Sequence, residues 1–150
     1  VYFSPSGNTK AMAEKLAKAT GADLFEIKPQ TPYTRADLDW TNNNSRSSIE
    51  MNDKSFRPQI AQLPNSLANY DTIFIGFPIW WYVAPTIINT FVENVDLNGK
   101  KVIPFATSGG SGMGKTLANL KPSCPGANWV EGKVINGMSE KALADWAEKL

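Results

Sequence analysis

The chain has 150 residues, of which 42% are hydrophobic, and its formal net charge is +1. This length and composition suit one domain with a packed core, and the balanced charge offers no basic surface of the kind that attracts nucleic acid or membranes. With one cysteine and no histidine, the sequence excludes an internal disulfide and a Ser-His-Asp triad, and it lacks the commonest metal ligand. Redox or group-transfer chemistry is therefore expected from a bound cofactor.

The first half of the chain alternates strand-like and helix-like segments. It starts inside the apolar run "VYF", which predicts a first strand that begins a few residues upstream of Val1. Residues 9–20 carry apolar side chains at helical spacing and predict a helix that ends at Gly21. The run "ADLFEI" predicts a second strand. Turn residues dominate from 28 to 69, with at most a short helix near residues 47–54.

The second half contains two unbroken apolar runs, "DTIFIGF" and "KVIPFAT", of the kind found in buried parallel strands. A helix is predicted after Pro85, a short helix before Pro122, a strand in "NWVEGKVI" and a last helix after the N-cap Ser139. The segments alternate as βαβαβαβαβα. They predict an α/β, three-layer, doubly wound domain with a five-stranded parallel sheet, spanning residues 1–150. Such sheets bind ligands at the carboxyl ends of their strands.

Residues 109–116, "GGSGMGKT", match the pattern G-x-x-x-x-G-K-[ST] of a nucleoside triphosphate-binding loop. A nucleotide hydrolase also needs an aspartate at the end of a second buried strand to hold magnesium. The preceding predicted strand ends "GFP" and the following one ends "KVING", so neither supplies that aspartate. Nucleotide hydrolysis at residues 109–116 is therefore kept only as a minor alternative.

A second candidate phosphate loop, "SPSGNT", follows the first predicted strand and opens the first helix. Backbone N–H groups and the helix dipole favour an anion at this position. The loop contains no lysine or arginine, so it suits a phosphomonoester that is held and not transferred. The alternative is an ordinary serine-rich turn that caps a helix.

Two more loops follow the third and fourth predicted strands. In "FPIWWYVAP" the adjacent tryptophans are costly to expose, so they either pack into the core or cover a flat aromatic ligand. In "TSGGSG" the glycines let the backbone approach a ligand, and its N–H groups can bond ring oxygens and nitrogens. A phosphate loop, an aromatic cover and a polar backbone edge on one side of a sheet fit flavin mononucleotide (FMN).

Taken in this order, the three motifs resemble those of the flavodoxin family, especially the flavodoxin-like group with a paired tryptophan. "SPSGNT" is similar to the family's phosphate loop, with serine where threonine is common, and "GFPIWW" and "PFATSGGSG" are similar to its two isoalloxazine loops. The resemblance covers nearly the whole chain and implies the strand order 2-1-3-4-5. It also implies that noncovalent FMN is bound by Ser4, Ser6, Gly7, Asn8 and Thr9 at the phosphate and by Pro78, Ile79, Trp80, Trp81, Thr107, Ser108, Gly109 and Gly110 around the ring.

The function that this resemblance implies is electron transfer, in the cytoplasm, with a redox partner protein or a small electron acceptor, by a monomer or weak dimer. An FMN-dependent NAD(P)H:quinone-type reductase is the alternative. No G-x-G-x-x-G loop is present, but a nicotinamide can stack directly on a flavin, so this absence decides little. A binding module that has lost the cofactor also stays open. No catalytic side chain, metal site, nucleic acid or membrane partner is predicted.

Overall fold

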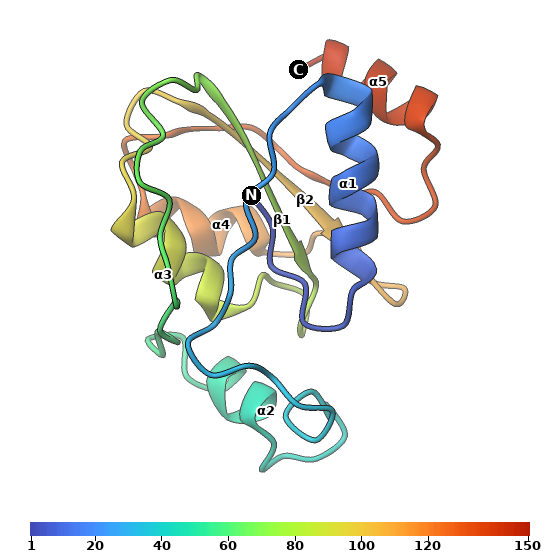
Figure 1. Ribbon diagram of the computed structural model, residues 1–150. Coiled ribbons are helices and arrows are strands. Elements are labelled where there is room, and N and C mark those ends of the chain that lie inside the picture. The colour runs from blue at the N-terminus through green and yellow to red at the C-terminus, as the bar shows by residue number, and fades with distance from the viewer.

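The computed structural model describes residues 1–150 as an α/β fold around a parallel sheet (Figure 1). Its centre is formed by the apolar strands β1 (Thr72–Pro78) and β2 (Lys101–Thr107), which pair in parallel along their whole length. Two short strands, β3 (Asn128–Trp129) and β4 (Lys133–Val134), both pair in parallel with β2. The long strands are buried because helices cover both faces of the sheet.

The sheet has four strands, so the expected five-stranded sheet is wrong. The first two predicted strands are reduced to isolated parallel bridges, in which Tyr2 pairs with Glu26 on one side and with Gly76 on the other. Pairing there is too short to form a ladder.

The last predicted strand is divided into β3 and β4, and the division falls opposite Pro104 of β2. Proline has no N–H to donate, so the ladder is interrupted at that position.

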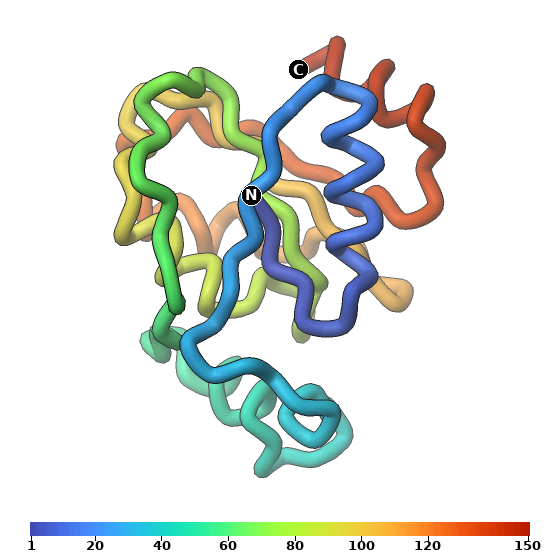
Figure 2. The backbone as a smooth tube through the Cα atoms, viewed as in Figure 1, coloured from blue at the N-terminus to red at the C-terminus, as the bar shows by residue number.

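The helices lie in two layers, as the backbone tube also shows (Figure 2). On one face α1 (Asn8–Thr20) packs beside α5 (Glu140–Glu148); on the other lie α3 (Thr86–Asn94), α4 (Thr116–Leu120) and the short 3-10 helix η1 (Lys121–Ser123). Helix α1 ends at Gly21, whose φ is 73°, and Ser139 caps α5 by accepting a hydrogen bond from the Ala142 N–H. Both helix boundaries are therefore confirmed.

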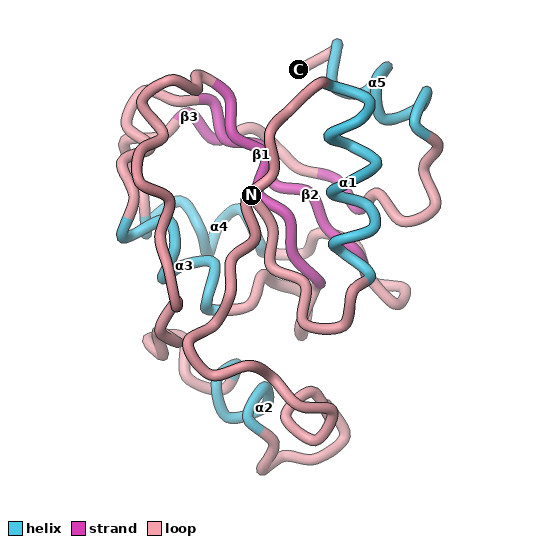
Figure 3. Tube along the Cα trace, viewed as in Figure 1, coloured by secondary structure: helices cyan, strands magenta, loops and turns pink.

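Residues 28–69 form a segment with little regular structure, which we call the lobe (Figure 3). Its one helix, α2 (Arg46–Met51), begins where the Ser45 side chain accepts a hydrogen bond from the Ser48 N–H. An antiparallel bridge between Pro29 and Ile60 closes the neck of the lobe. The part of the lobe beyond this neck projects past the end of the sheet toward which β1 points (Figure 1). No helix of the chain is both long enough and apolar enough to cross a membrane.

We expect Gly76→Ala to destabilise the protein, because a Cβ at this position of β1 would overlap the buried ring of Phe105 in β2. Such overpacking costs about 1–3 kcal/mol of unfolding free energy, measurable by urea denaturation. Gly112→Ala is the control, since a Cβ there meets no atom within 4 Å, and it should change stability by less than about 0.5 kcal/mol. Equal losses in the two variants would contradict this packing.

Candidate functional site

The three predicted site loops meet at Thr107, the last residue of β2. Pro78 at the end of β1 lies opposite Thr107 in the sheet. The N–H of the next residue, Ile79, donates to the Thr107 carbonyl oxygen at 2.9 Å. From the first turn of α1, the Thr9 hydroxyl lies 2.8 Å from the Thr107 hydroxyl, and both residues are buried. The pairing of β1 with β2 brings both ring-loop candidates to one edge of the sheet, and the contact between the Thr9 and Thr107 hydroxyls brings the phosphate-loop candidate to the same edge.

The loop before α1 presents a row of free backbone donors. Gly7 has a φ of 91° and turns the chain into the helix, while Ser4 Oγ accepts the Lys10 N–H at 2.9 Å. The backbone N–H groups of residues 6–9 donate to no acceptor within the protein. Because they open a helix of 13 residues, the helix dipole adds positive potential at the same point. This donor set fits a phosphate oxyanion without any cationic side chain.

The paired tryptophans follow β1 in a tight turn. Trp80 and Val83 exchange backbone hydrogen bonds of 2.9 and 3.2 Å, and the residues between them, Trp81 and Tyr82, have φ values of 48° and 68°. Left-handed backbone at two non-glycine residues stores about 1–2 kcal/mol at each and is found preferentially at functional sites. Trp80 is directed into the protein, whereas Trp81 is 45% exposed, so the pair divides between the core and the surface.

Trp80 belongs to an aromatic cluster that joins the sheet to the lobe. Its ring meets Phe3 and Tyr33 edge to face, at centroid distances of 5.8 and 5.7 Å. The Tyr33 hydroxyl donates to the buried carboxylate of Glu50, and the Arg46 guanidinium lies 3.7 Å from the centre of the Tyr33 ring. Burial, and then the hydrogen bond to Glu50, raise the pKa of Tyr33 well above its ordinary value. Tyr33 therefore remains a neutral hydrogen-bond donor at physiological pH.

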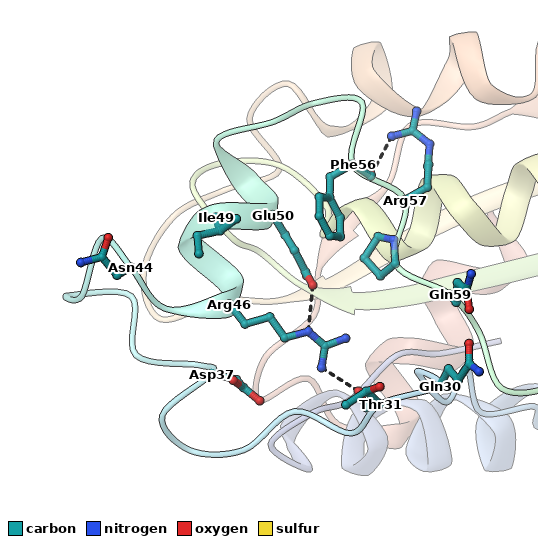
Figure 4. Close-up of a pocket in the computed structure, with 11 residues that line it drawn as sticks. Gln30, Thr31, Asp37, Asn44, Arg46, Ile49, Glu50, Phe56, Arg57 and Gln59 are labelled. Carbon is teal, nitrogen blue, oxygen red and sulfur yellow. Dashed lines mark hydrogen bonds and ion pairs between the residues drawn. The ribbon is translucent and has the colours of Figure 1, made fainter.

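A polar hollow of about 650 Å³ lies inside the lobe (Figure 4). Arg46 extends across it between the Glu50 carboxylate, at 2.9 Å, and the Thr31 carbonyl oxygen, at 2.6 Å. Arg57, on another wall, is paired with Glu93 at 2.8 Å. Because both guanidinium groups are held by protein carboxylates, the hollow offers a ligand no free positive charge.

The loop after β2 is held by a residue that sequence reasoning missed. Asn136 accepts the Ser108 N–H at 2.8 Å and donates to the Ser108 carbonyl oxygen at 2.9 Å. Ser108 Oγ accepts the Gly110 N–H at 3.2 Å, and Gly110 has a φ of 150°. The Gly109 N–H donates to no protein acceptor and is free for a ligand. Asn136 follows the short strand β4, and nothing in its local pattern signals this contact.

The "GKT" part of residues 109–116 packs against the turn that holds Trp81 and Tyr82. Thr116 is fully buried and its hydroxyl donates to the Met113 carbonyl oxygen, so this hydroxyl is not exposed to a ligand. The Lys115 N–H donates to the Tyr82 carbonyl oxygen at 3.2 Å, which supports the strained turn. Helix α4 has only five residues. No group of three or more metal-ligating side chains occurs in the chain.

A parallel sheet covered by helices on both faces, with candidate ligand loops gathered at the carboxyl ends of its strands, is typical of flavodoxin-like α/β proteins. The family model described as flavodoxin matches residues 1–150, and the chain belongs to the flavodoxin family.

Individual relatives agree with this class. A candidate flavoprotein from Bacteroides eggerthii is 52% identical with a TM-score of 0.94, over 99% of this chain and 93% of its own. A flavoprotein from Lactobacillus acidophilus, solved in complex with FMN, is 27% identical with a TM-score of 0.62, over 87% of each chain. The uncharacterized NAD(P)H oxidoreductase YcaK of Escherichia coli is 31% identical over 99 residues, 65% of this chain but only 45% of YcaK.

We expect Thr9→Val and Thr107→Val each to lower the free energy of unfolding by about 1–3 kcal/mol, because each leaves the other buried hydroxyl without its partner. The double variant removes both polar groups and should cost clearly less than the sum of the two single changes. Urea denaturation of the four proteins measures the coupling. Additive losses would show that the two hydroxyls do not depend on each other.

Proposed function

We propose that the protein is an electron-transfer flavoprotein that binds FMN noncovalently at the carboxyl ends of the sheet. The observation that carries the proposal is the set of free N–H groups at residues 6–9, tied to the ring-loop candidates through Thr9 and Thr107. The FMN complex of the Lactobacillus acidophilus relative supports the same cofactor. The flavin supplies the redox chemistry, while the chain binds and orients it.

In this proposal the phosphate is bound by Ser4, Ser6, Gly7, Asn8 and Thr9. The N–H groups of residues 6–9 donate to its oxygens, and the Ser6 hydroxyl and Asn8 amide, which have no partner in the protein, add side-chain donors. Ser4 Oγ keeps the loop in shape by accepting the Lys10 N–H. Because all of these donors are neutral, the bound phosphate keeps its negative charge.

The ring is proposed to lie between the loop of residues 78–81 and the loop of residues 107–110. Trp81, exposed on its strained turn, stacks on the ring, while Trp80 supports that turn from the protein side. Pro78 and Ile79 form the floor beside Thr107. Ser108, Gly109 and Gly110 offer the polar edge, in which the free Gly109 N–H faces a ring acceptor.

We further infer that residues 1–150 act as one domain with the strand order 2-1-3-4-5. The parallel bridges of Tyr2 to Glu26 and to Gly76 support this order, since they place the segment around Tyr2 between the segment around Glu26 and β1. Because the Trp81 indole is exposed, a ring stacked on it lies near the surface, within reach of a redox partner protein or a small acceptor. A monomer or weak dimer suffices for this role.

FMN should bind at least about 100-fold more tightly than riboflavin, because riboflavin lacks the phosphate that accepts the charge-assisted hydrogen bonds.

Gly7→Ala should weaken the binding of FMN about tenfold, because the φ of 91° at this position strains any residue other than glycine. Fluorescence titration of the cofactor-free protein measures both affinities.

Gly21→Ala is the matched control, because it introduces the same left-handed strain at the other end of α1 without touching the loop. It should leave FMN affinity unchanged, as should Lys115→Ala. Equal binding of riboflavin and FMN, or dependence on Lys115, would overturn the phosphate assignment.

A second candidate function, an FMN-dependent NAD(P)H:quinone-type reductase, is favoured by the similarity to YcaK. Mixing the FMN-loaded protein with stoichiometric NADPH under anaerobic conditions separates the two. An electron carrier should keep its yellow colour for minutes, whereas dithionite bleaches it at once. Bleaching by NADPH within the mixing time would establish the reductase and reject the carrier.

A further inference from the structure

A groove of about 960 Å³ separates the phosphate-loop candidate from the lobe. Pro5 and Ser6 form one side, and Tyr33, Arg35 and Trp40 lie on the lobe side. The volume lies in the range of small-molecule sites. The lobe lies beside the loop that leads into α1 (Figure 1), so the groove opens next to the proposed cofactor site.

Two side chains on the lobe side are exposed to solvent. The Trp40 side chain is 72% exposed, which is costly for an indole in water. Arg35 is exposed, and its side chain forms neither an ion pair nor a hydrogen bond. This distinguishes it from Arg46 and Arg57, which are both paired with carboxylates. The groove therefore presents an exposed aromatic side chain and an unpaired positive charge.

The charges around Arg35 leave that positive charge available. Asp39 is the acidic side chain on the groove wall, and its Oδ1 accepts hydrogen bonds from the N–H and hydroxyl of Thr41. Asp37, two residues from Arg35, accepts the Thr34 N–H at 2.8 Å. Both carboxylates are thus bound locally, and neither forms an ion pair with Arg35.

Tyr33 connects this groove with the proposed ring site. It lines the groove and also packs edge to face on Trp80, the neighbour of Trp81. A molecule in the groove would therefore lie against Tyr33 and Ser6, which both adjoin the proposed cofactor site.

We propose that this groove binds the reaction partner of the flavin, and that this partner is a planar aromatic molecule that carries an anionic group. Its ring lies against Trp40, and its anionic group pairs with Arg35. The inference rests on the proposed function for the identity of the partner. A quinone with a sulfonate or carboxylate and a nicotinamide dinucleotide with its phosphates share this chemistry.

The test is calorimetric titration of the oxidised, FMN-loaded protein with three probes: naphthoquinone sulfonate, naphthoquinone without a charged group, and NADP⁺. Arg35→Gln should weaken the binding of the charged quinone or of NADP⁺ about tenfold. It should change the affinity for uncharged naphthoquinone by no more than about twofold. Trp40→Ala should weaken quinones of both kinds about tenfold, and Trp40→Phe should restore most of the affinity. The anionic probe that depends on Arg35 identifies the source.

Ile49→Ala is the control for the lobe, because Ile49 is 52% exposed on α2 and does not line this groove. It should change none of the affinities. If Arg35→Gln affects neither anionic probe, the proposal is wrong. The proposal is also wrong if Arg35→Gln and Trp40→Ala weaken the binding of FMN and not that of the probes, because the groove would then hold the cofactor itself.

Failure of the proposed function has a different result. A protein that takes up no FMN would reject the electron-transfer assignment. The same titrations on that protein would still support an aromatic-anion site if they depend on Arg35 and Trp40, and would reject it if they do not.

Discussion

The buried hydrogen bond between the Thr9 and Thr107 hydroxyls is the contact on which the site depends. It joins the first turn of α1 to the last residue of β2 at 2.8 Å, away from water. A hydroxyl in such a position is stable only when it is partnered, so the pair permits essentially one placement of the helix end relative to the strand ends. The free N–H groups of residues 6–9 are thereby held at a set position relative to both ring-loop candidates.

The lobe supports the site through a second polar contact, centred on the Glu50 carboxylate. Glu50 is only 2% exposed and is bound by Arg46 and the Tyr33 hydroxyl. A buried carboxylate without these partners would be strongly destabilising, so the three side chains act as a unit. Because Tyr33 packs on Trp80, this unit also sets the position of the inner tryptophan. The loop of residues 78–81 is therefore supported from the lobe as well as from the sheet.

Local sequence patterns predict the parts of this structure that depend on local physics. The buried runs of β1 and β2, the period of α1 and the capping by Ser139 and Gly21 are each visible in a few adjacent residues. The division of the last strand opposite Pro104 depends on the pairing register, which the sequence does not show. The contact of Asn136 with Ser108 spans 28 residues, and the left-handed turn at Trp81 and Tyr82 uses no glycine. Neither has a local signal.

The distribution of positive charge connects the proposed phosphate site with the groove. Of the arginines, Arg46 and Arg57 neutralise protein carboxylates, and the loop of residues 4–9 contains no cation. A phosphate held by neutral N–H donors keeps its charge, and at short range it repels a second anion that approaches Ser6. Arg35 lies on the opposite wall of the groove that Ser6 lines, with its charge unpaired. In the proposed complex, Arg35 would offset that repulsion and let an anionic reaction partner approach the flavin from this side.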